Sequence, residues 1–530
     1  MGSGRTIVIG AGHNGLTAAF YLAKAGRRPL VLERRSVVGG GGLTEEIAPG
    51  FRCPTLSHEE RLHRRIVVDM NLPAFGAQWI PESVDTCALD PAGPALVLFH
   101  DAARTVEWLG RRSPRDAARW ADFSRTTKRI AGFMRQLLDA APPDVAHPAL
   151  RDMWRMLKVY LEARALDRAD AYRLMRWLPM PVADMVEEWF EDDVLRAAIA
   201  ARGLLGTSHG PRAAGSTLVW LTREAHDLSA HPVPARVRGG PGALTGAMAR
   251  AAQSVGAEIR VGQRVERIVV SGDRVSGVVV EGRDIAADCV VSGADPKTTF
   301  LTLMDPADVP PDLAAQIGHY RSAGTMAKLN IALSALPRLR GVSDALHLSG
   351  RIHIGPSIDA LEDAGSPLKY GAWSPSPWLE VRLPSLVDGT LAPRGAHVAS
   401  VYVHGAPRHL KESSWAVERA SLLAACMRTL EDYAPGFGSL VVSAQLLTPE
   451  DIEREHGMWG GHGFHGDLAL DQWFAMRPTY GYARHDTPVR GLFLCGAGTH
   501  PGGFLVGTSG RLAAERALRE RGASKGSTHN

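Results

Sequence analysis

The first 33 residues carry the feature that most limits what this chain can fold into. Residues 7–9 are a short β-branched run typical of a buried parallel strand, and glycines with G-x-G-x-x-G spacing follow at Gly10, Gly12 and Gly15. A segment with apolar residues at helical intervals comes next, and a second apolar run then ends in Glu33, 18 residues after Gly15. This order of strand, glycine turn, helix, strand and acid is that of a dinucleotide-binding fold.

Each part of this segment has a physical task. Gly10 makes the tight turn, Gly12 lets the backbone approach a pyrophosphate, and Gly15 lets the helix pack closely on the strand. The free N–H groups at the start of the helix then face the phosphates, and Glu33 can accept hydrogen bonds from a ribose. The same glycine spacing recurs within residues 461–466, but no strand pattern precedes it, so we interpret that match as a loop.

A second glycine run shows which dinucleotide to expect. Gly39, Gly40 and Gly41 lie shortly after Glu33. A nicotinamide dehydrogenase needs no glycine loop at this point. A flavin dinucleotide is longer, and its pyrophosphate and ribityl chain must be accommodated beyond the first helix. The spacing therefore predicts FAD as the cofactor.

These glycines resemble the FAD-binding signature of the flavoproteins that include amine oxidases and carotenoid desaturases. That family often continues the glycine pair with Arg, where this chain has Gly41. Residues 491–518 read as a strand, a glycine loop and a helix, and residues 494–507 are similar to the flavin motif of bacterial-type phytoene desaturases. Residues 12–15, 39–51 and 465–478 together resemble the pyridine nucleotide-disulphide oxidoreductase domain-containing protein 2 group.

The resemblance implies an α/β fold, with a Rossmann-like FAD-binding domain of the glutathione-reductase-like, amine oxidase/desaturase type and an inserted α+β substrate domain. The expected FAD-binding parts are residues 1–75, 231–300 and 446–521, with a helix-rich substrate or lid insert at 76–230, a substrate domain at 301–445 and a disordered tail at 522–530. The expected cofactor-binding residues are Gly10, Gly12, His13, Asn14, Gly15, Glu33, Arg34, Gly39, Gly40, Gly41, Val265, Gly496, Ala497, Gly498, Val506 and Gly507. The last two begin the final helix, whose N–H groups would face the flavin pyrimidine carbonyl.

The segments between these parts have other patterns. Alternating apolar residues around Gly-Asp turns predict an antiparallel meander that begins at Val265, and residues 323–336 and 397–404 read as strands. Residues 113–227 are helix-rich, with a core-facing spacing at Met153, Met156, Leu157, Tyr160 and Leu161. An apolar cluster within residues 172–190 allows three interpretations: a pocket for an apolar substrate, a membrane contact, or a helical core.

The resemblance implies an FAD-dependent oxidoreductase that dehydrogenates, saturates or isomerises a C–C bond of an apolar small molecule. His465 and His500 can exchange protons near the flavin edge, and Lys328 is similar in placement to the strand lysine that holds a water near the flavin in amine oxidases. We find no second fingerprint for a nicotinamide cofactor, so we expect the reduced flavin to react with oxygen or a quinone, or to be recycled within an isomerase cycle. An amine or amino-acid oxidase, or a binding protein without redox chemistry that is similar to the Rab GDP-dissociation inhibitors, stays open.

Composition excludes several other classes. The net charge of +4 is small for 530 residues and arginine is scattered, so nucleic-acid binding has no support. No run of about 18 apolar residues could span a bilayer, and the chain leads directly into a strand without a signal segment, so we expect a cytoplasmic protein. Peripheral contact with a membrane and the oligomeric state stay open.

Three further patterns predict no extra chemistry. The five cysteines are isolated and form no C-x-x-C pair, so we expect them to be reduced and buried. The G-x-S-x-G match at residues 206–210 lacks the strand and helix of a hydrolase elbow. His456, His462 and His465 have a metal-like density in a glycine-rich loop, but the resemblance explains this loop as a wall near the flavin, and we predict no metal.

Overall fold

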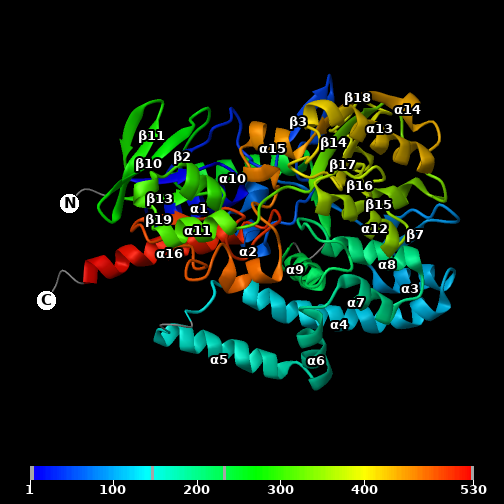
Figure 1. Cartoon of the computed structure of the whole chain (residues 1–530), viewed down its shortest axis with the longest axis horizontal. Helices are drawn as coiled ribbons and strands as arrows, with labels where there is room; N and C mark the ends of the chain where they lie inside the picture. The colour runs from blue at the N-terminus through cyan, green and yellow to red at the C-terminus, as the bar shows by residue number, and fades with distance from the viewer. Residues whose placement is uncertain (1–4, 145–147, 231–233, 527–530) are drawn as a thin grey trace.

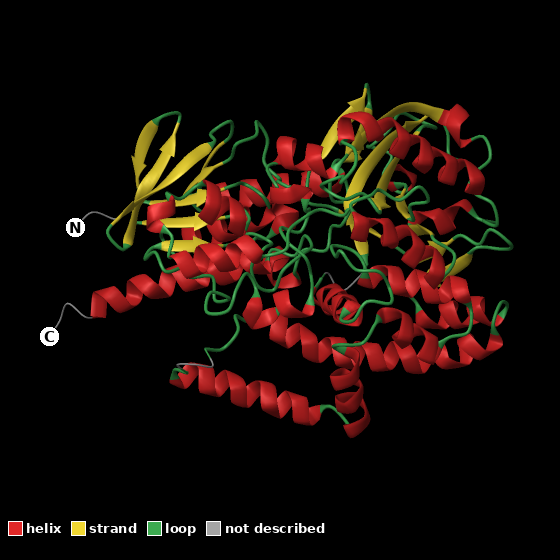
Figure 2. Cartoon of the chain, viewed as in Figure 1, coloured by secondary structure: helices red, strands yellow, loops and turns green. Residues whose placement is uncertain are grey.

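The computed structural model describes residues 5–144, 148–230 and 234–526, and two separate sheets organise the molecule (Figures 1 and 2). At one end lies a parallel sheet with the strand order β19-β13-β1-β2-β9. Its strands are β1 (Thr6–Ile9), β2 (Leu30–Leu32), β9 (Glu258–Arg260), β13 (Cys289–Ser292) and β19 (Leu492–Leu494). Three distant parts of the sequence therefore build one Rossmann-like sheet, as predicted.

Helices from both ends of the chain cover this sheet. α1 (His13–Lys24) packs against α10 (Gly240–Ser254) and against α16 (Thr508–Gly526). The approach to α16 is close, because a Cβ atom at Gly510 would collide with the backbone carbonyl of Asn14. The predicted meander is confirmed as β10 (Val265–Ser271), β11 (Arg274–Val280) and β12 (Arg283–Ala286), which stand beside the parallel sheet.

The second sheet is mixed and has the strand order β18-β14-β17-β16-β15-β6-β7. Its strands are β6 (Val84–Ala88), β7 (Leu96–Phe99), β14 (Met326–Leu333), β15 (Arg351–Ile354), β16 (Leu379–Arg382), β17 (His397–His404) and β18 (Val441–Leu447). β14 and β17 confirm the two strands predicted from alternation. β6 and β7 come from the stretch expected to form the helix-rich insert, so this stretch also contributes an edge to the sheet.

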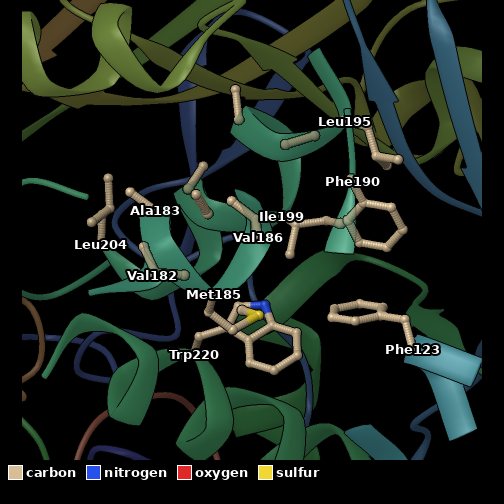
Figure 3. Close-up of a cluster of buried hydrophobic side chains, with 14 of the residues drawn as sticks. Phe123, Val182, Ala183, Met185, Val186, Phe190, Leu195, Ile199, Leu204 and Trp220 are labelled. Atoms are coloured by element: carbon tan, nitrogen blue, oxygen red, sulfur yellow. The ribbon is translucent and has the colours of Figure 1, made fainter. Parts of the chain in front are cut away.

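A helical layer lies below this sheet in Figure 1. It consists of α3 (Ala102–Gly110), α4 (Pro114–Leu138), α5 (Leu150–Ala165), α6 (Arg168–Trp177), α7 (Val182–Trp189), α8 (Asp193–Ala200) and α9 (Ser216–Ser229). Figure 3 shows its core, where Phe123 of α4 and Trp220 of α9 lie beside Met185 and Phe190. Most of the apolar cluster within residues 172–190 is therefore helical core, whereas Tyr172 and Met175 are 62% and 74% exposed.

The expectation that α5 presents its apolar face to a core is wrong. Its side chains at helical spacing are all at least 40% exposed: Met153, Trp154, Met156, Leu157, Tyr160 and Leu161. Figure 1 shows α5 and α6 at the outer edge of the molecule. The spacing correctly predicts an amphipathic helix, but α5 turns the polar Asp152 inward, where the carboxylate lies 3.8 Å from Arg484, and leaves the apolar stripe uncovered.

The remaining helices and strands connect these layers. They are β3 (Thr44–Ala48), β4 (Phe51–Pro54), α2 (Arg64–Asp69), β5 (Trp79–Pro81), β8 (Ala235–Val237), α11 (Pro311–His319), α12 (Ile358–Gly365), α13 (Trp415–Tyr433), α14 (Phe437–Leu440) and α15 (Pro449–His456). α16 continues to Gly526, so residues 522–526 of the tail expected to be disordered are helical, and residues 527–530 lie outside the described residues. None of the described helices combines the length and the apolar character that crossing a membrane would require.

Candidate functional site

The predicted glycine turn opens into a cavity of about 1320 Å³, a volume that includes space open to solvent. Twelve of the predicted site residues line it: Gly10, Gly12, His13, Asn14, Gly15, Glu33, Arg34, Gly40, Gly41, Val265, His465 and Ala497. The beginning, middle and end of the chain therefore meet at one elongated site, as the sequence predicted.

One glycine at this site is required by a close backbone approach. A Cβ atom at Gly15 would fall on the carbonyl oxygen of Gly10, whereas a Cβ atom at Gly12 would make only an ordinary contact, 3.7 Å from the Cα atom of Gly40. Gly12 is also the N-cap of α1 and supplies no side-chain acceptor. The first N–H groups of α1 therefore stay available at the cavity wall, which suits a pyrophosphate.

Glu33 lies where a ribose-binding acid is expected. Its carboxylate accepts hydrogen bonds from the backbone N–H groups of Ala11 at 2.7 Å and Arg35 at 2.9 Å. The side chain is buried and lines the cavity beside Arg34. Arg35 and Arg264 line the cavity as well, so cations are present although Gly41 replaces the arginine that often follows the glycine pair in the family.

Five predicted cofactor residues lie outside the cavity lining: Gly39, Gly496, Gly498, Val506 and Gly507. Gly39 donates its N–H to the carbonyl of Ala11, so it holds the second glycine turn in place without facing the cavity. A Cβ atom at Gly507 would meet Leu62 and Ile66, so this glycine serves the packing of α16. From this segment Phe504 and Leu505 reach the cavity instead. The motif is correctly located, but the residues that face the cavity are offset from those predicted.

Two buried polar atoms at the cavity fit a polar ligand. Within the described residues, Nε2 of His13 and Nδ1 of His465 have no hydrogen-bond partner. Burial, followed by the neighbouring His465, lowers the pKa of His13 to about 4, so its imidazole is neutral at pH 7. An unpaired buried polar group is costly unless a ligand or water satisfies it. The glycine turns, the acid and these imidazoles together fit a flavin dinucleotide.

Comparison with known proteins agrees with this geometry. The family model for NAD(P)-binding Rossmann-like domains matches residues 8–60, and the model for flavin-containing amine oxidoreductases matches residues 100–518. The chain belongs to the flavin-containing amine oxidoreductase family. The pyridine nucleotide-disulfide oxidoreductase domain-containing protein 2 of Rattus norvegicus is 33% identical over 97% of this chain and 93% of its own length.

Two further proteins are similar to this chain over nearly their full length. The phytoene desaturase (lycopene-forming) of Pantoea ananas is 26% identical, covering 97% of this chain and 98% of its own. The structure of cyclohexylamine oxidase from Brevibacterium oxydans superposes with a TM-score of 0.58 at 14% identity, covering 98% of this chain and 99% of the other, and shows the shared fold. The flavin-containing amine oxidoreductase described here is an FAD-dependent enzyme. FAD supplies a ring that accepts and returns a hydride.

A second cavity of about 560 Å³ adjoins the first and is mostly apolar. The two share lining residues at Gly41, Ser57, Met458, Gly463 and Phe464, so they form one continuous site. Its remaining lining includes Leu56, Gly206, Gly324, Thr325, Met326, Ala327, Lys328, Tyr402, Ile452, Gly461 and His462. A flavin in the first cavity would therefore present one end to an apolar chamber.

Lys328 lines this chamber from β14 and is only 2% exposed. Its ammonium group donates hydrogen bonds to Oδ1 of Asn330 at 2.5 Å and to Oγ of Ser400 at 2.6 Å. Burial lowers the pKa of Lys328 to about 8, so a substantial fraction of the amine is neutral in mildly alkaline solution. A buried amine that titrates near physiological pH can exchange protons with a ligand in the chamber.

The two predicted catalytic histidines have different positions. His465 lines the first cavity, and burial lowers its pKa, so a neutral imidazole faces the site. His500 lines neither cavity. Its Nε2 donates to the carbonyl of Ala140 at 3.0 Å, and its ring packs on Phe474. The structure therefore brings His465, but not His500, to the candidate site.

The remaining motifs behave as the sequence predicted. Residues 461–466 follow the helix α15 and form a loop without a strand before it. Ser208 of the G-x-S-x-G match donates to Asp467 at 2.7 Å, and this match follows a helix, not a strand. All five cysteines are buried and free, and burial raises the pKa of Cys495 to about 12.

His456, His462 and His465 do not form a metal-like group in the described chain. His456 pairs with Arg35 and His462 with Asp467. The one such group found among the described residues is His58, Glu59 and Glu380, whose potential ligand atoms lie within 4.8 Å of one another. Arg223 pairs with Glu59, and Arg351 lies 3.8 Å from Glu380. These guanidinium groups neutralise the two carboxylates, so a divalent cation there would meet strong repulsion.

Sequence reasoning missed several lining residues. Ser57, Thr298, Leu303 and Phe504 line the first cavity, and Tyr402 lines the second. Thr298 begins a π-helical turn shortly after β13, a position that only the folded sheet brings to the site. Two signals were available: Phe504 lies within the motif at residues 494–507, and Arg264, which also lines the first cavity, is adjacent to Val265.

Proposed function

We propose that this FAD-dependent enzyme acts on a C–C bond of an apolar small molecule, by dehydrogenation, saturation or isomerisation. The observation that supports the proposal most directly is the chamber beside the flavin cavity. Leu56, Met326, Ile452, Met458 and Phe464 give it an apolar wall. The relative from Pantoea ananas is a phytoene desaturase, and phytoene is a substrate of this apolar kind.

Two residues of this chain would handle the proton of the reaction. Dehydrogenation removes a hydride, which FAD accepts, and a proton, which needs a base near the substrate. Lys328 borders the apolar chamber, and His465 borders the flavin cavity. We assign proton transfer with the substrate to Lys328 and a hydrogen-bonding function toward the cofactor to His465.

An amine or amino-acid oxidase is the alternative within the same fold. The family model is named for amine oxidoreductases, and a solved structure of an amine oxidase superposes well. An amine substrate is a cation at pH 7, and sites for buried cations supply a carboxylate or an aromatic cage. No Asp or Glu is among the described residues that line the apolar chamber, which favours the C–C reading.

A panel of reductants tests the choice of substrate class. The purified enzyme should be yellow, with flavin absorbance near ~450 nm, and polyenes, fatty acids and amines are then added under anaerobic conditions. Bleaching by a polyene or an unsaturated or saturated fatty acid supports the proposal. Bleaching by amines alone overturns it in favour of an oxidase. Reoxidation of the bleached enzyme by oxygen or by a soluble quinone identifies the electron acceptor, for which we propose one of these two.

The exposed face of α5 supports a further part of this proposal, namely peripheral contact with a lipid surface in the cytoplasm. Trp154 and Tyr160 are aromatic side chains of the type that insert at a membrane interface, and Lys158 and Arg164 lie on the same helix for anionic headgroups. Tyr172 and Met175 of α6 extend this apolar face. An apolar substrate would reach the enzyme from such a surface.

Vesicle binding tests this contact. We expect the enzyme to co-sediment with phosphatidylcholine vesicles that contain phosphatidylglycerol, and the Trp154→Ser/Leu157→Ser double variant to remain in the supernatant. Leu346→Ser is the matched control, because Leu346 is 64% exposed on another part of the surface. Equal sedimentation of all three proteins, or none by the unaltered enzyme, would exclude the contact.

A further inference from the structure

A chain of buried hydrogen bonds leads from Lys328 to a carboxylate on the neighbouring strands. Oγ of Ser400 accepts from Lys328 at 2.6 Å and lies 3.1 Å from Nδ1 of His58. Nε2 of His58 lies 3.1 Å from Oε1 of Glu380. All four side chains are buried, and Ser400 and Glu380 come from the adjacent strands β17 and β16. None of the three residues beyond Lys328 belongs to a motif recognised in the sequence.

The ionisation state of Glu380 determines which atom donates in each hydrogen bond between Glu380 and Lys328. Burial tends to raise the pKa of Glu380, but Arg351 and then His58 outweigh burial and hold it well below its usual range. The ionised carboxylate can only accept, so Nε2 of His58 carries the hydrogen. Burial lowers the pKa of His58 to about 4, and its neutral ring therefore offers Nδ1 as an acceptor.

The same reasoning determines which atoms donate and accept hydrogen bonds at the Lys328 amine. Because Nδ1 of His58 accepts, the hydroxyl hydrogen of Ser400 points at it, and the Ser400 oxygen must face Lys328 as an acceptor. The second partner of Lys328 is equally fixed. The amide N–H of Asn330 donates to the carbonyl of Thr55 at 3.1 Å, which leaves Oδ1 for the amine. A neutral amine has two N–H bonds, and these two acceptors bind both.

We propose that Glu380, His58 and Ser400 are positioning residues that aim the lone pair of Lys328 at the apolar chamber. With both N–H bonds held, the remaining tetrahedral direction of the nitrogen is the one left for a ligand. The amine would accept the proton that the substrate releases and form a new N–H bond, while the electron pair of that C–H bond would become the new C=C bond. The second C–H bond would lose its hydrogen with both electrons as a hydride, which bound FAD would accept. The assignment of this step rests on the proposed function.

Ser400, His58 and Glu380 make the contacts of a Ser-His-Glu catalytic triad, but the serine is not accessible to a substrate. Ser400 is fully buried and lines neither cavity, so no substrate carbonyl can reach its oxygen. The Ser400 oxygen also accepts a hydrogen bond from the Lys328 nitrogen, which makes it less available as an attacking group. The chain therefore serves the lysine, and acyl transfer at the serine is excluded by access.

Other charged groups surround this chain and must be separated from it in a test. Cys53 and Tyr402 face Lys328, His404 and Glu59 face His58, and Arg351 and Arg223 face Glu380. Glu59 is the useful comparison. It is buried in the same group and its pKa is lowered, because Arg223 and Arg61 outweigh the effect of burial. Within the described part of the chain, its carboxylate pairs with Arg223 and Arg61 and not with the imidazole, so it offers the same charge without the directional contact.

The closing experiment compares Glu380→Gln with Glu59→Gln in the FAD-loaded enzyme. Nitrogen NMR of labelled histidine, with His58→Asn to assign the signal, reads which ring nitrogen carries hydrogen. Carbon NMR of labelled lysine, with Lys328→Met for assignment, reads the Lys328 titration. We expect the unaltered enzyme and Glu59→Gln to keep hydrogen on Nε2. In Glu380→Gln the new amide N–H can donate to Nε2 of His58, so the ring hydrogen moves to Nδ1. The hydroxyl hydrogen of Ser400 then turns from His58 toward the Lys328 amine. We expect the Lys328 pKa to fall by about 1 unit more than in Glu59→Gln.

A kinetic arm uses any compound that bleaches the flavin in the panel. We expect Glu380→Gln and Ser400→Ala to slow anaerobic bleaching by at least about tenfold, and Ser400→Thr, which keeps a hydroxyl, to recover most of the rate. Glu59→Gln should stay within about threefold. If no compound bleaches the flavin, the proposed function fails, while the NMR signals still decide the positioning chain. Hydrogen on Nδ1 in the unaltered enzyme, or identical tautomers and lysine titrations in both glutamine variants, would overturn it.

Discussion

The carboxylate of Glu33 accepts a hydrogen bond of 2.7 Å from the backbone N–H of Ala11, so the acid after the second strand is tied to the glycine turn after the first. The two halves of the dinucleotide fingerprint thus hold each other in place before any ligand binds. Such preorganisation reduces the ordering that binding itself requires.

Replacement of Glu33 should therefore weaken FAD binding. Glu33→Gln keeps the shape of the side chain but loses the charge, and hydrogen bonds to charged groups contribute about 1.5–3 kcal/mol. We expect the dissociation constant for FAD to rise about ten- to hundredfold, measured by flavin fluorescence during titration of the apoprotein. Glu258→Gln, at an exposed acid on β9 of the same sheet, is the control and should bind FAD normally.

The glycine turn makes a sharper prediction. In Gly15→Ala the new methyl group would collide with the carbonyl of Gly10, and because that atom is backbone the turn itself must shift. We expect the purified variant to lose most of its bound flavin, read as the ratio of absorbance near ~450 nm to protein absorbance. Gly132→Ala in α4 meets no atom within 4 Å, so it should retain its flavin and gain about 0.5–1 kcal/mol in helix stability. Equal flavin content in the two variants would contradict the close approach.

The lowered pKa of Lys328 predicts how the free energy of unfolding changes with pH. Its pKa falls from the ordinary 10.5 to about 8 because of burial, so between these pH values the unfolded chain binds the extra proton. The free energy of unfolding of the unaltered protein therefore rises with pH through this window. Lys328→Met should be more stable at pH 7 by up to about 3 kcal/mol, with the difference shrinking toward pH 10.5. Urea denaturation at both pH values measures it, and a difference that grows with pH would contradict the sign.

The two predicted catalytic histidines should respond differently to substitution. His465 lines the flavin cavity, whereas His500 contacts Ala140 outside it. We expect His465→Asn to slow anaerobic flavin bleaching by at least about tenfold, and to shift the flavin absorption spectrum even without substrate. His500→Gln can still donate to Ala140 and should leave both readings close to those of the unaltered enzyme. A larger effect at His500 would show that the site extends further than the cavities.

Buried histidines predict destabilisation by acid. Burial lowers the pKa of His226, His353 and His485 to about 4, and that of His404 and His500 to about 3. From pH 6.5 down to these values the unfolded chain binds more protons, so the free energy of unfolding falls as pH falls. Each histidine contributes up to about 1.4 kcal/mol per pH unit. Denaturant midpoints between pH 7 and 5 should show this slope. We expect His500→Gln to reduce the slope by the contribution of about one proton, and His409→Gln, at an exposed histidine, to leave it unchanged.

The parts of the fold that were predictable are those with local chemical requirements. Gly15 is needed because a side chain there would meet the backbone of Gly10, Gly10 has a positive φ of 89°, and residues 397–404 form a strand that is buried almost throughout. The apolar stripe of α5 was interpreted wrongly, since periodicity reports that a helix has two faces but not which one finds a partner. His58, Ser400 and Glu380 were missed because only strand pairing brings together residues more than 300 positions apart.

The site residues show the same division. Glu33 and Val265 both line the cavity, and each has a place determined by a strand, because Glu33 directly follows β2 and Val265 begins β10. Val506 and Gly507 were predicted from the same motif as Leu505, and a shift of one or two residues at the start of α16 decides which of them faces the cavity. Which of these residues faces the cavity depends on contacts with Leu62 and Ile66, which lie far away in the sequence.

The order of strands in the parallel sheet has a consequence for biosynthesis. β1 emerges from the ribosome first, yet its neighbour β13 appears some 280 residues later, and the edge strand β19 ends at residue 494. β2 can pair with one edge of β1 early, but the other edge of β1 has no partner strand until β13 is synthesised. Cofactor loading has to wait for chain release, and chaperones that shield that edge of β1 would set the yield of active enzyme in cells.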